Sequence, residues 1–187
     1  MVRAALAIWT ARGFGTGIEE TTIEEIVSAA GVTKGTFYFH FTRKEEILLE
    51  MGWESAAVAN REAARCVSAN RELDEALVRV IRALSRHIRA APPGAVARAV
   101  AEFRRLTEAE RAAFGREDFG DGLELLLVHA ATVGQLPASA DPVELAQILR
   151  ALWMDSVLDW ATGHSDLAVS LRRRSRLVIE GVHRTSA

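Results

Sequence analysis

The sequence has little cysteine, few aromatic residues and no long apolar run. Cys66 is its only cysteine, which excludes an internal disulfide and any site built from several cysteine ligands. Aromatic residues make up only 6% of the 187 residues, which argues against a β-rich fold. The longest apolar runs, such as residues 125–128, are far too short to span a bilayer. No basic segment followed by an apolar stretch opens the chain. We therefore expect a cytoplasmic protein without a membrane partner.

Neither sign of charge dominates the chain. The sequence holds 23 Lys and Arg against 25 Asp and Glu, a formal net charge of −2. Residues 1–50 are also slightly acidic. Overall charge therefore gives no indication of nucleic-acid binding, and any such binding must depend on the local placement of a few cations. All basic residues except Lys34 and Lys44 are arginine, which draws attention to these two lysines.

Alanine and leucine are abundant, and apolar residues recur at helical spacing. Between residues 73 and 88 they come every three or four positions, and the segments 142–162 and 166–183 repeat this pattern. No segment shows sustained alternation with β-branched residues. We predict an all-α fold whose helices span 2–12, 22–29, 33–39, 43–67, 72–90, 94–106, 107–114, 121–133, 142–162 and 166–183.

Residues 21–41 carry the signals of two short helices joined by a tight turn. Thr21 or Thr22 is a suitable N-cap, and the acidic residue three positions later completes a capping box. The small residues at 29–31 allow two helices to approach closely, and Gly31 can adopt a positive φ. Thr33 is suited to cap the second helix. The pattern indicates a helix-turn-helix.

The second of these helices has distinct inner and outer faces. Phe37 and Phe41, four residues apart, can anchor it to a core, which leaves a polar set on the other side: Lys34, Thr36, Tyr38 and His40. A helix fits the major groove, where such side chains can reach base edges and phosphates. Gly35 offers no side chain and would allow close approach to the DNA backbone. The alternative is a capped short helix within an ordinary bundle.

Three segments together resemble the DNA-binding domain of the tetracycline-repressor (TetR) family. They are TTIEEI at 21–26, AGVTKGTFYFHF at 30–41 and KEEIL at 44–48, and the resemblance covers about a quarter of the chain. It implies a three-helix DNA-binding domain at residues 1–47. A larger helical domain for ligand binding and dimerisation would follow at residues 48–187. It also implies a repressor that a small-molecule effector releases from a near-palindromic double-stranded operator.

The resemblance also assigns roles to individual residues. It implies that Lys34 and Thr36 reach bases, and that phosphates are contacted by Thr22, Thr33, Tyr38, His40 and Lys44. Two features depart from the family pattern. The connection between the first two family helices carries an insertion at residues 15–18, and the basic arm before the first helix is reduced to Arg3.

No other motif indicates catalysis or a cofactor. The five histidines are dispersed without metal-ligand spacing, and no phosphate-binding loop or nucleophile elbow is present. We therefore expect no metal, no cofactor and no enzymatic activity. The basic run Arg172–Arg174 with Arg176 is interpreted as a solvated helix face, with an anion contact as the alternative.

The C-terminal part is expected to hold an effector cavity and the homodimer interface. Residues that could line the cavity, or else pack in the core, are Trp53, Phe103, Phe114, His129 and Trp153. The last two helices are expected to pair with those of a second copy through Leu145, Leu149, Leu152, Leu171 and Val178. The alternatives to a DNA-binding regulator are a small all-α enzyme that uses this cavity and a helical interaction module.

Overall fold

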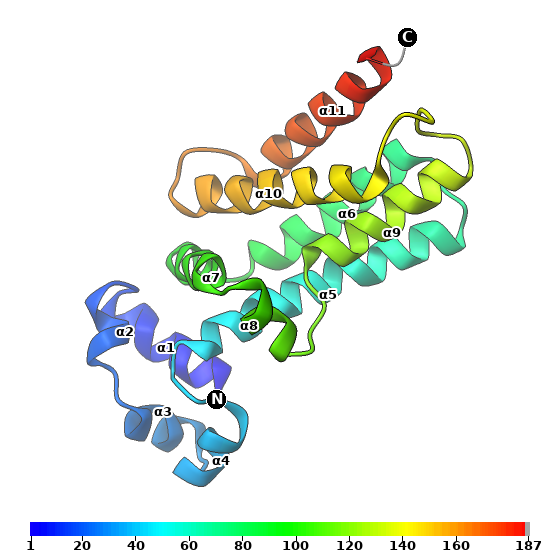
Figure 1. Cartoon of the computed structure of the whole chain (residues 1–187). Helices are drawn as coiled ribbons and strands as arrows, with labels where there is room; N and C mark the ends of the chain where they lie inside the picture. The colour runs from blue at the N-terminus through cyan, green and yellow to red at the C-terminus, as the bar shows by residue number, and fades with distance from the viewer. Residues whose placement is uncertain (186–187) are drawn as a thin grey trace.

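A computed structural model describes residues 1–185, apart from the side chains at positions 108, 112 and 185. All regular structure in this range is helical, so the all-α prediction is confirmed (Figure 1). The helices are α1 Val2–Arg12, α2 Thr16–Glu20, α3 Ile23–Ala30, α4 Lys34–His40, α5 Glu46–Ser68, α6 Leu73–Ile88, α7 Pro93–Arg105, α8 Glu108–Ala113, α9 Phe119–Thr132, α10 Pro142–Ala161 and α11 Leu167–Thr185.

Helix α2 is the one element that the sequence did not predict. It overlaps residues 15–18, the stretch that was interpreted as a loop insertion, and continues to Glu20. Ile18 of this helix is fully buried, and a Cβ on Gly17 would lie 2.6 Å from the Cβ of Arg12. The inserted residues therefore fold into a short helix that packs tightly on the end of α1.

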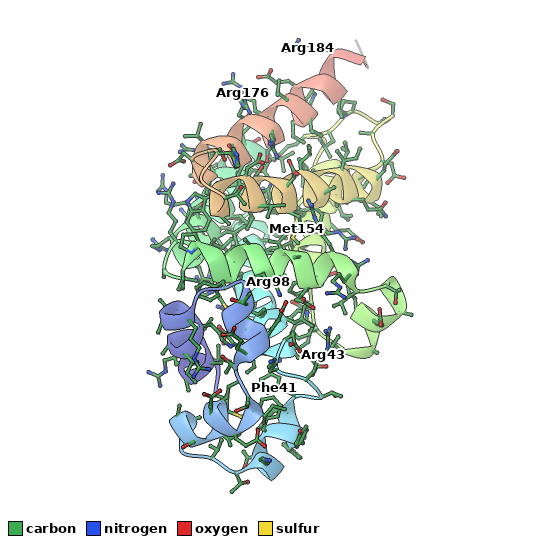
Figure 2. The ribbon with its side chains drawn as sticks, turned by 90° about the vertical axis from the view of Figure 1, so that its left-hand side faces the viewer. Phe41, Arg43, Arg98, Met154, Arg176 and Arg184 are labelled. Carbon is green, nitrogen blue, oxygen red and sulfur yellow. The ribbon has the colours of Figure 1, made fainter. Side chains whose placement is uncertain are left out.

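The N-terminal helices share a small core with the beginning of α5 and with α7. Trp9, Ile26 and Phe37 are fully buried in it, and Ala95 and Ala99 of α7 close it from above. The core thus extends past residue 47, the predicted domain boundary. Because α7 contributes to this core and also packs on α5 and α10, it lies between the N-terminal helices and the C-terminal ones (Figure 2).

A larger core joins α5, α6, α9, α10 and α11. Helix α6 shows the pattern most clearly, since its eight buried residues lie on one face. On the last two helices, the Trp153 indole donates a hydrogen bond of 2.9 Å to the Ser175 hydroxyl, deep inside this core. These helices therefore close the subunit before any second copy is added.

Three of the five residues predicted for the dimer interface are buried within the subunit. Leu145, Leu149 and Leu171 are buried in the subunit's own core, while Leu152 and Val178 are only partly buried. The helices α10 and α11 expose other apolar side chains instead: Val143, Ile148, Val169 and Leu177. The periodicity identified the buried face of each helix, and Leu145, Leu149 and Leu171 lie on that face. Leu152 and Val178 remain predictions for the interface.

Candidate DNA interface and effector cavity

Helix α3 begins with the predicted capping box. The Thr22 hydroxyl accepts from the Glu25 backbone N–H at 3.2 Å, and the Glu25 carboxylate accepts from the Thr22 N–H at 2.8 Å. Arg12 of α1 holds the same carboxylate at 2.6 Å. These donors, the Arg12 guanidinium foremost, lower the pKa of Glu25 from its usual 4.5 to about 2. The start of α3 is thereby tied to the end of α1.

The turn between α3 and α4 has the geometry that the sequence indicated. Gly31 adopts a φ of 67°, in the left-handed region that favours glycine. Its N–H donates to the carbonyl of Ser28, and the Val32 N–H donates to that of Val27 at 3.0 Å. The carbonyls at the end of α3 are thus satisfied while the chain reverses direction within a few residues.

Helix α4 is capped by Thr33, whose hydroxyl accepts from the Thr36 N–H at 3.1 Å. Phe37 is fully buried and Phe41 packs beside it, with ring centroids 5.6 Å apart. These two side chains anchor the helix, as predicted. The opposite face projects into solvent and includes Tyr38, which is 58% exposed.

Several of the predicted DNA contacts already have partners within the protein. Lys34 forms an ion pair with Glu24 of α3, and this carboxylate raises the pKa of the lysine. The Lys44 ammonium donates to the carbonyls of Glu19 and Thr21, both at 2.7 Å, and so caps the end of α2. Thr22, Thr33 and Thr36 bond within their own helix starts. The remaining predicted contacts, Gly35, Tyr38 and His40, lie exposed on α4.

Phe39 is a residue of this face that the sequence analysis left out. It is 84% exposed, the highest value of any large apolar side chain described, and its ring meets that of His40 edge to face. Position 39 falls between the anchors Phe37 and Phe41, so its helical phase alone could have placed it outward. An apolar ring on an exposed helix face is suited to contact a thymine methyl group.

A cavity of about 610 Å³ lies between the N-terminal helices and the C-terminal domain. Its wall includes Val2 and Leu6 of α1, Met51 of α5, Val100 of α7 and Met154 of α10. Figure 2 labels Met154 at the level where α10 faces α7. This volume and apolar lining are typical of small-molecule sites.

Phe103 separates this cavity from a second one of about 240 Å³. Its ring fits over Gly52, where an added Cβ would lie 1.9 Å from the ring, so α5 requires glycine at this point. The second cavity is more polar and includes Arg104 and Arg150. Both arginines are already paired, with Asp155 and Asp118 respectively.

The residues predicted to line an effector cavity lie in three different places. Phe103 lines both cavities, and Trp53 lines the second. The Phe114 ring lies further toward the surface, with its centroid 4.5 Å from that of the Trp53 ring. Trp153 is buried in the core, where Ser175 satisfies its indole N–H. His129 lies near the far end of α9, hydrogen-bonded to Asn70 at 3.0 Å. Neither Trp153 nor His129 lines either cavity. The polar atoms of both side chains form their hydrogen bonds outside the cavities.

Two further features of the described residues bear on other functions. These residues contain no group of three or more side chains placed to hold a metal ion. Over the same part of the chain, no helix is both long and apolar enough to cross a membrane.

Comparisons of the sequence find relatives of the N-terminal region. The model of the family described as "Bacterial regulatory proteins, tetR family" matches residues 2–51. A curated relative, the uncharacterized HTH-type transcriptional regulator YerO of Bacillus subtilis (strain 168), is 39% identical over 49 residues. That match covers 26% of this chain and only 16% of the relative.

Solved structures resemble the chain over almost its whole length. The transcriptional repressor FadR of Thermus thermophilus, in complex with lauroyl-CoA, matches with a TM-score of 0.75 and 29% identity, covering 96% of this chain and 92% of that one. FadR of Bacillus subtilis, in complex with stearoyl-CoA, matches with a TM-score of 0.68 and 20% identity, covering 97% of each chain. At that identity the second likeness shows the fold alone.

Proposed function

The chain belongs to the tetR family of bacterial regulatory proteins, and from this premise we propose that it is a repressor released from its operator by a fatty-acyl thioester of coenzyme A. The observation that carries the proposal is the apolar cavity between α1, α5, α7 and α10. One of its walls is the first helix of the DNA-binding domain. A ligand placed there touches the two parts of the protein that a regulator must couple.

We propose that the DNA-binding form is a homodimer. Each subunit would place its α4 in a major groove, with the two helices about 34–36 Å apart on a near-palindromic operator. The exposed apolar residues of α10 and α11, Ile148, Val169 and Leu177 among them, supply a surface for the second subunit. Tyr38, Phe39 and His40 would contact DNA directly, whereas Lys34 would have to exchange its partner Glu24 for a phosphate or a base.

The cavity fits an acyl chain better than a polar effector. Most of its lining residues are apolar, and flexible Met51 and Met154 can adjust to a chain of variable length. The solved structure that supports this choice is the Thermus thermophilus repressor, which is 29% identical to this chain and is in complex with lauroyl-CoA.

The release would work through differential affinity for two arrangements of the helices. An acyl chain that separates α1 from α7 would change how the N-terminal helices sit on the rest of the subunit. In the dimer this would move the two α4 helices away from the spacing that the operator requires.

The test begins with the operator, located as a protected near-palindrome in the intergenic DNA beside the gene. Binding of the purified dimer to that fragment is followed by fluorescence anisotropy while lauroyl-CoA or coenzyme A is added. We expect lauroyl-CoA to release the DNA and coenzyme A to leave it bound. Release by neither compound overturns the effector assignment, and failure to protect any DNA overturns the regulatory role.

A cavity-filling variant links the response to this site. Val100→Phe places a larger ring in the wall of the cavity, and Val133→Phe makes the same change at an exposed position after α9. Val100→Phe should still bind the operator but require at least tenfold more lauroyl-CoA for release, whereas Val133→Phe should behave like the wild type. Equal sensitivity of the two variants would place the acyl chain elsewhere.

A further inference from the structure

The arginines of the basic run on α11 have different partners. Arg174 turns toward α10 and pairs with Asp155 and Asp159, each at 2.6 Å. Arg176 pairs with Glu180 at 2.5 Å on its own helix. Arg172 has no acidic partner among the described residues and borders a groove between α6 and α11. Arg173 also has no acidic partner among the described residues, but it does not line this groove. Arg172 is therefore the residue of the run that can supply the anion contact here.

The groove concentrates positive charge. It has a volume of about 530 Å³, and Arg82, Arg86 and Arg89 of α6 line it together with Arg172. Its lining includes no acidic residue. Arg89 pairs with Asp166, while Arg82 and Arg86 form no ion pair within the part of the chain that the structure describes. Three guanidinium groups thus border one groove without a carboxylate to balance them.

A buried hydroxyl in the same groove also lacks a partner. Ser85 is only 4% exposed and lines the groove, yet its oxygen makes no hydrogen bond among the described residues. The buried serines Ser55, Ser156 and Ser175 each donate at 2.8 Å to the carbonyl four residues earlier in their helix. Ser85 is therefore an exception, and a buried polar group without a partner is destabilising unless a ligand satisfies it.

We propose that this groove is a binding site for a phosphate group. Guanidinium groups match phosphate oxygens in pairs of parallel hydrogen bonds, and several of them suit a dianion better than a single carboxylate. Arg82, Arg86 and Arg172 supply the charge. The Ser85 hydroxyl, which is buried at the floor of the empty groove, turns toward the phosphate and donates to one of its oxygens. The site lies between the end of α6 and the start of α11, on the other side of α7 from α4, so the DNA bound by α4 does not supply the phosphate (Figure 1).

The phosphate can come from a free phosphorylated compound or from the phosphorylated end of a larger effector. The second source is geometrically open because Ala90 borders both this groove and the large apolar cavity. The site stands independently of the acyl-CoA proposal, since free phosphate alone tests it.

The experiment is a calorimetric titration of the full-length protein at low ionic strength, with inorganic phosphate as the first probe and coenzyme A as the second. Low salt is needed because these arginines are exposed and screening weakens their attraction. We expect saturable binding of one phosphate per subunit. A tenfold preference for coenzyme A over phosphate would assign the site to an effector's phosphorylated end, and equal affinities would assign it to a free compound.

Three variants make the test specific. The double variant Arg86→Gln/Arg172→Gln should weaken phosphate binding at least tenfold. Ser85→Ala should weaken it several-fold without lowering the melting temperature, since it removes a hydroxyl that has no partner in the empty protein. The control Arg61→Gln/Arg65→Gln removes the same charge from exposed positions on α5 and should bind phosphate like the wild type.

Three results would overturn the proposal. They are absence of saturable binding in the wild type, unchanged affinity in Arg86→Gln/Arg172→Gln, and an equal loss in the control, which would indicate a general charge effect. If Ser85→Ala binds phosphate with unchanged affinity, the hydroxyl does not contact the phosphate, and the argument that the groove is a preformed site fails.

Discussion

Arg43 and Glu102 form an ion pair between the end of the helix-turn-helix and α7, with 3.4 Å between Nη1 and Oε2. The Glu102 side chain is 4% exposed and that of Arg43 is 45% exposed. Arg43 lies in the connection that follows α4, and Figure 2 labels it below α7. Glu102 directly precedes Phe103, which lines both cavities. The pair therefore connects the cavity wall to the chain that positions the recognition helix.

Arg43→Gln should reduce the response to an effector more than it reduces DNA binding. Without Arg43, the one cation of the described residues that still pairs with the buried carboxylate of Glu102 is Arg105, at 3.7 Å. Because Arg43 is half exposed, we expect a loss of about 1 kcal/mol in the free energy of unfolding. Urea unfolding checks the stability, and operator anisotropy with and without lauroyl-CoA checks the response.

The matched control for this prediction is Arg65→Gln, which removes a pair with Glu62 on one helix surface. It should change neither quantity. A full effector response in Arg43→Gln would show that the ion pair only stabilises the fold.

Glu24→Gln should tighten binding to duplex DNA. The carboxylate of Glu24 neutralises Lys34, and it would also repel the phosphates near α4. Lys34→Ala should weaken the same binding and lower the slope of log affinity against log salt by about 0.9 for each phosphate that the lysine no longer neutralises. Both side chains of the pair are more than half exposed, so melting temperatures should change little. Weaker DNA binding in Glu24→Gln would show that DNA requires the pair to stay intact.

Gly35→Ala should stabilise the free protein and weaken its binding to DNA. An added Cβ would lie 3.6 Å from the Thr33 hydroxyl oxygen, an ordinary contact, and alanine favours a helix over glycine by about 0.5–1 kcal/mol. On DNA the same methyl group would meet the backbone that Gly35 lets approach. Gly181→Ala on α11 is the control, because it also adds a methyl group to a helix but far from α4. Unchanged operator affinity in Gly35→Ala would rule out a close approach at this position.

Acid should destabilise the N-terminal helices through Glu25. Its pKa is lowered by Arg12 and by the Thr22 N–H from 4.5 to about 2, so the folded state binds fewer protons than the unfolded state in this interval. The stabilisation is complete above pH 4.5 and is lost as the pH falls toward 2. Glu25→Gln should flatten this part of the stability profile, measured by urea unfolding at successive pH values. Arg12→Gln should flatten it too; a wild-type profile in both variants would contradict the assignment.

Leu177→Glu should produce helical monomers, whereas Leu171→Glu should unfold the subunit. Leu177 is 62% exposed on α11, while Leu171, on the same helix, is fully buried in the core of the subunit. In a two-fold interface a glutamate at 177 brings two unpaired charges together. Light scattering gives the mass and circular dichroism the helix content. A dimer that survives Leu177→Glu would move the interface away from this face of α11.

Local signals in the sequence predicted the helix-turn-helix almost to the residue. The caps Thr22 and Thr33 and the turn at Gly31 depend on neighbours within three or four positions, and such contacts can be recognised without the fold. The partners of Lys34 and Lys44 could not be predicted in this way. Glu24 lies on another helix, and the carbonyls that Lys44 binds belong to a helix that the sequence did not indicate.

The same limit explains the errors in the C-terminal domain. Helical periodicity separates an apolar face from a polar one, but it does not tell which neighbour covers the apolar face. Leu149 and Leu171 face the subunit's own core, and the apolar side chains that α10 and α11 expose, Val143 and Ile148 among them, are fewer and more scattered. The groove lined by Arg82, Arg86 and Arg172 is formed by two helices far apart in the sequence. The sequence therefore drew attention only to the arginine run on α11 and not to the arginines of α6.

The placement of α1 in the wall of the large cavity has a consequence for the ligand as well as for DNA. Coupling between two sites is reciprocal, so a ligand that weakens operator binding by a given factor is itself bound more weakly by that factor when the operator is occupied. The operator would therefore act as an antagonist of the effector. A subunit pair on its operator would respond only at higher effector concentrations than the free protein, and measurements of effector affinity made without DNA would overstate the sensitivity of the regulated gene.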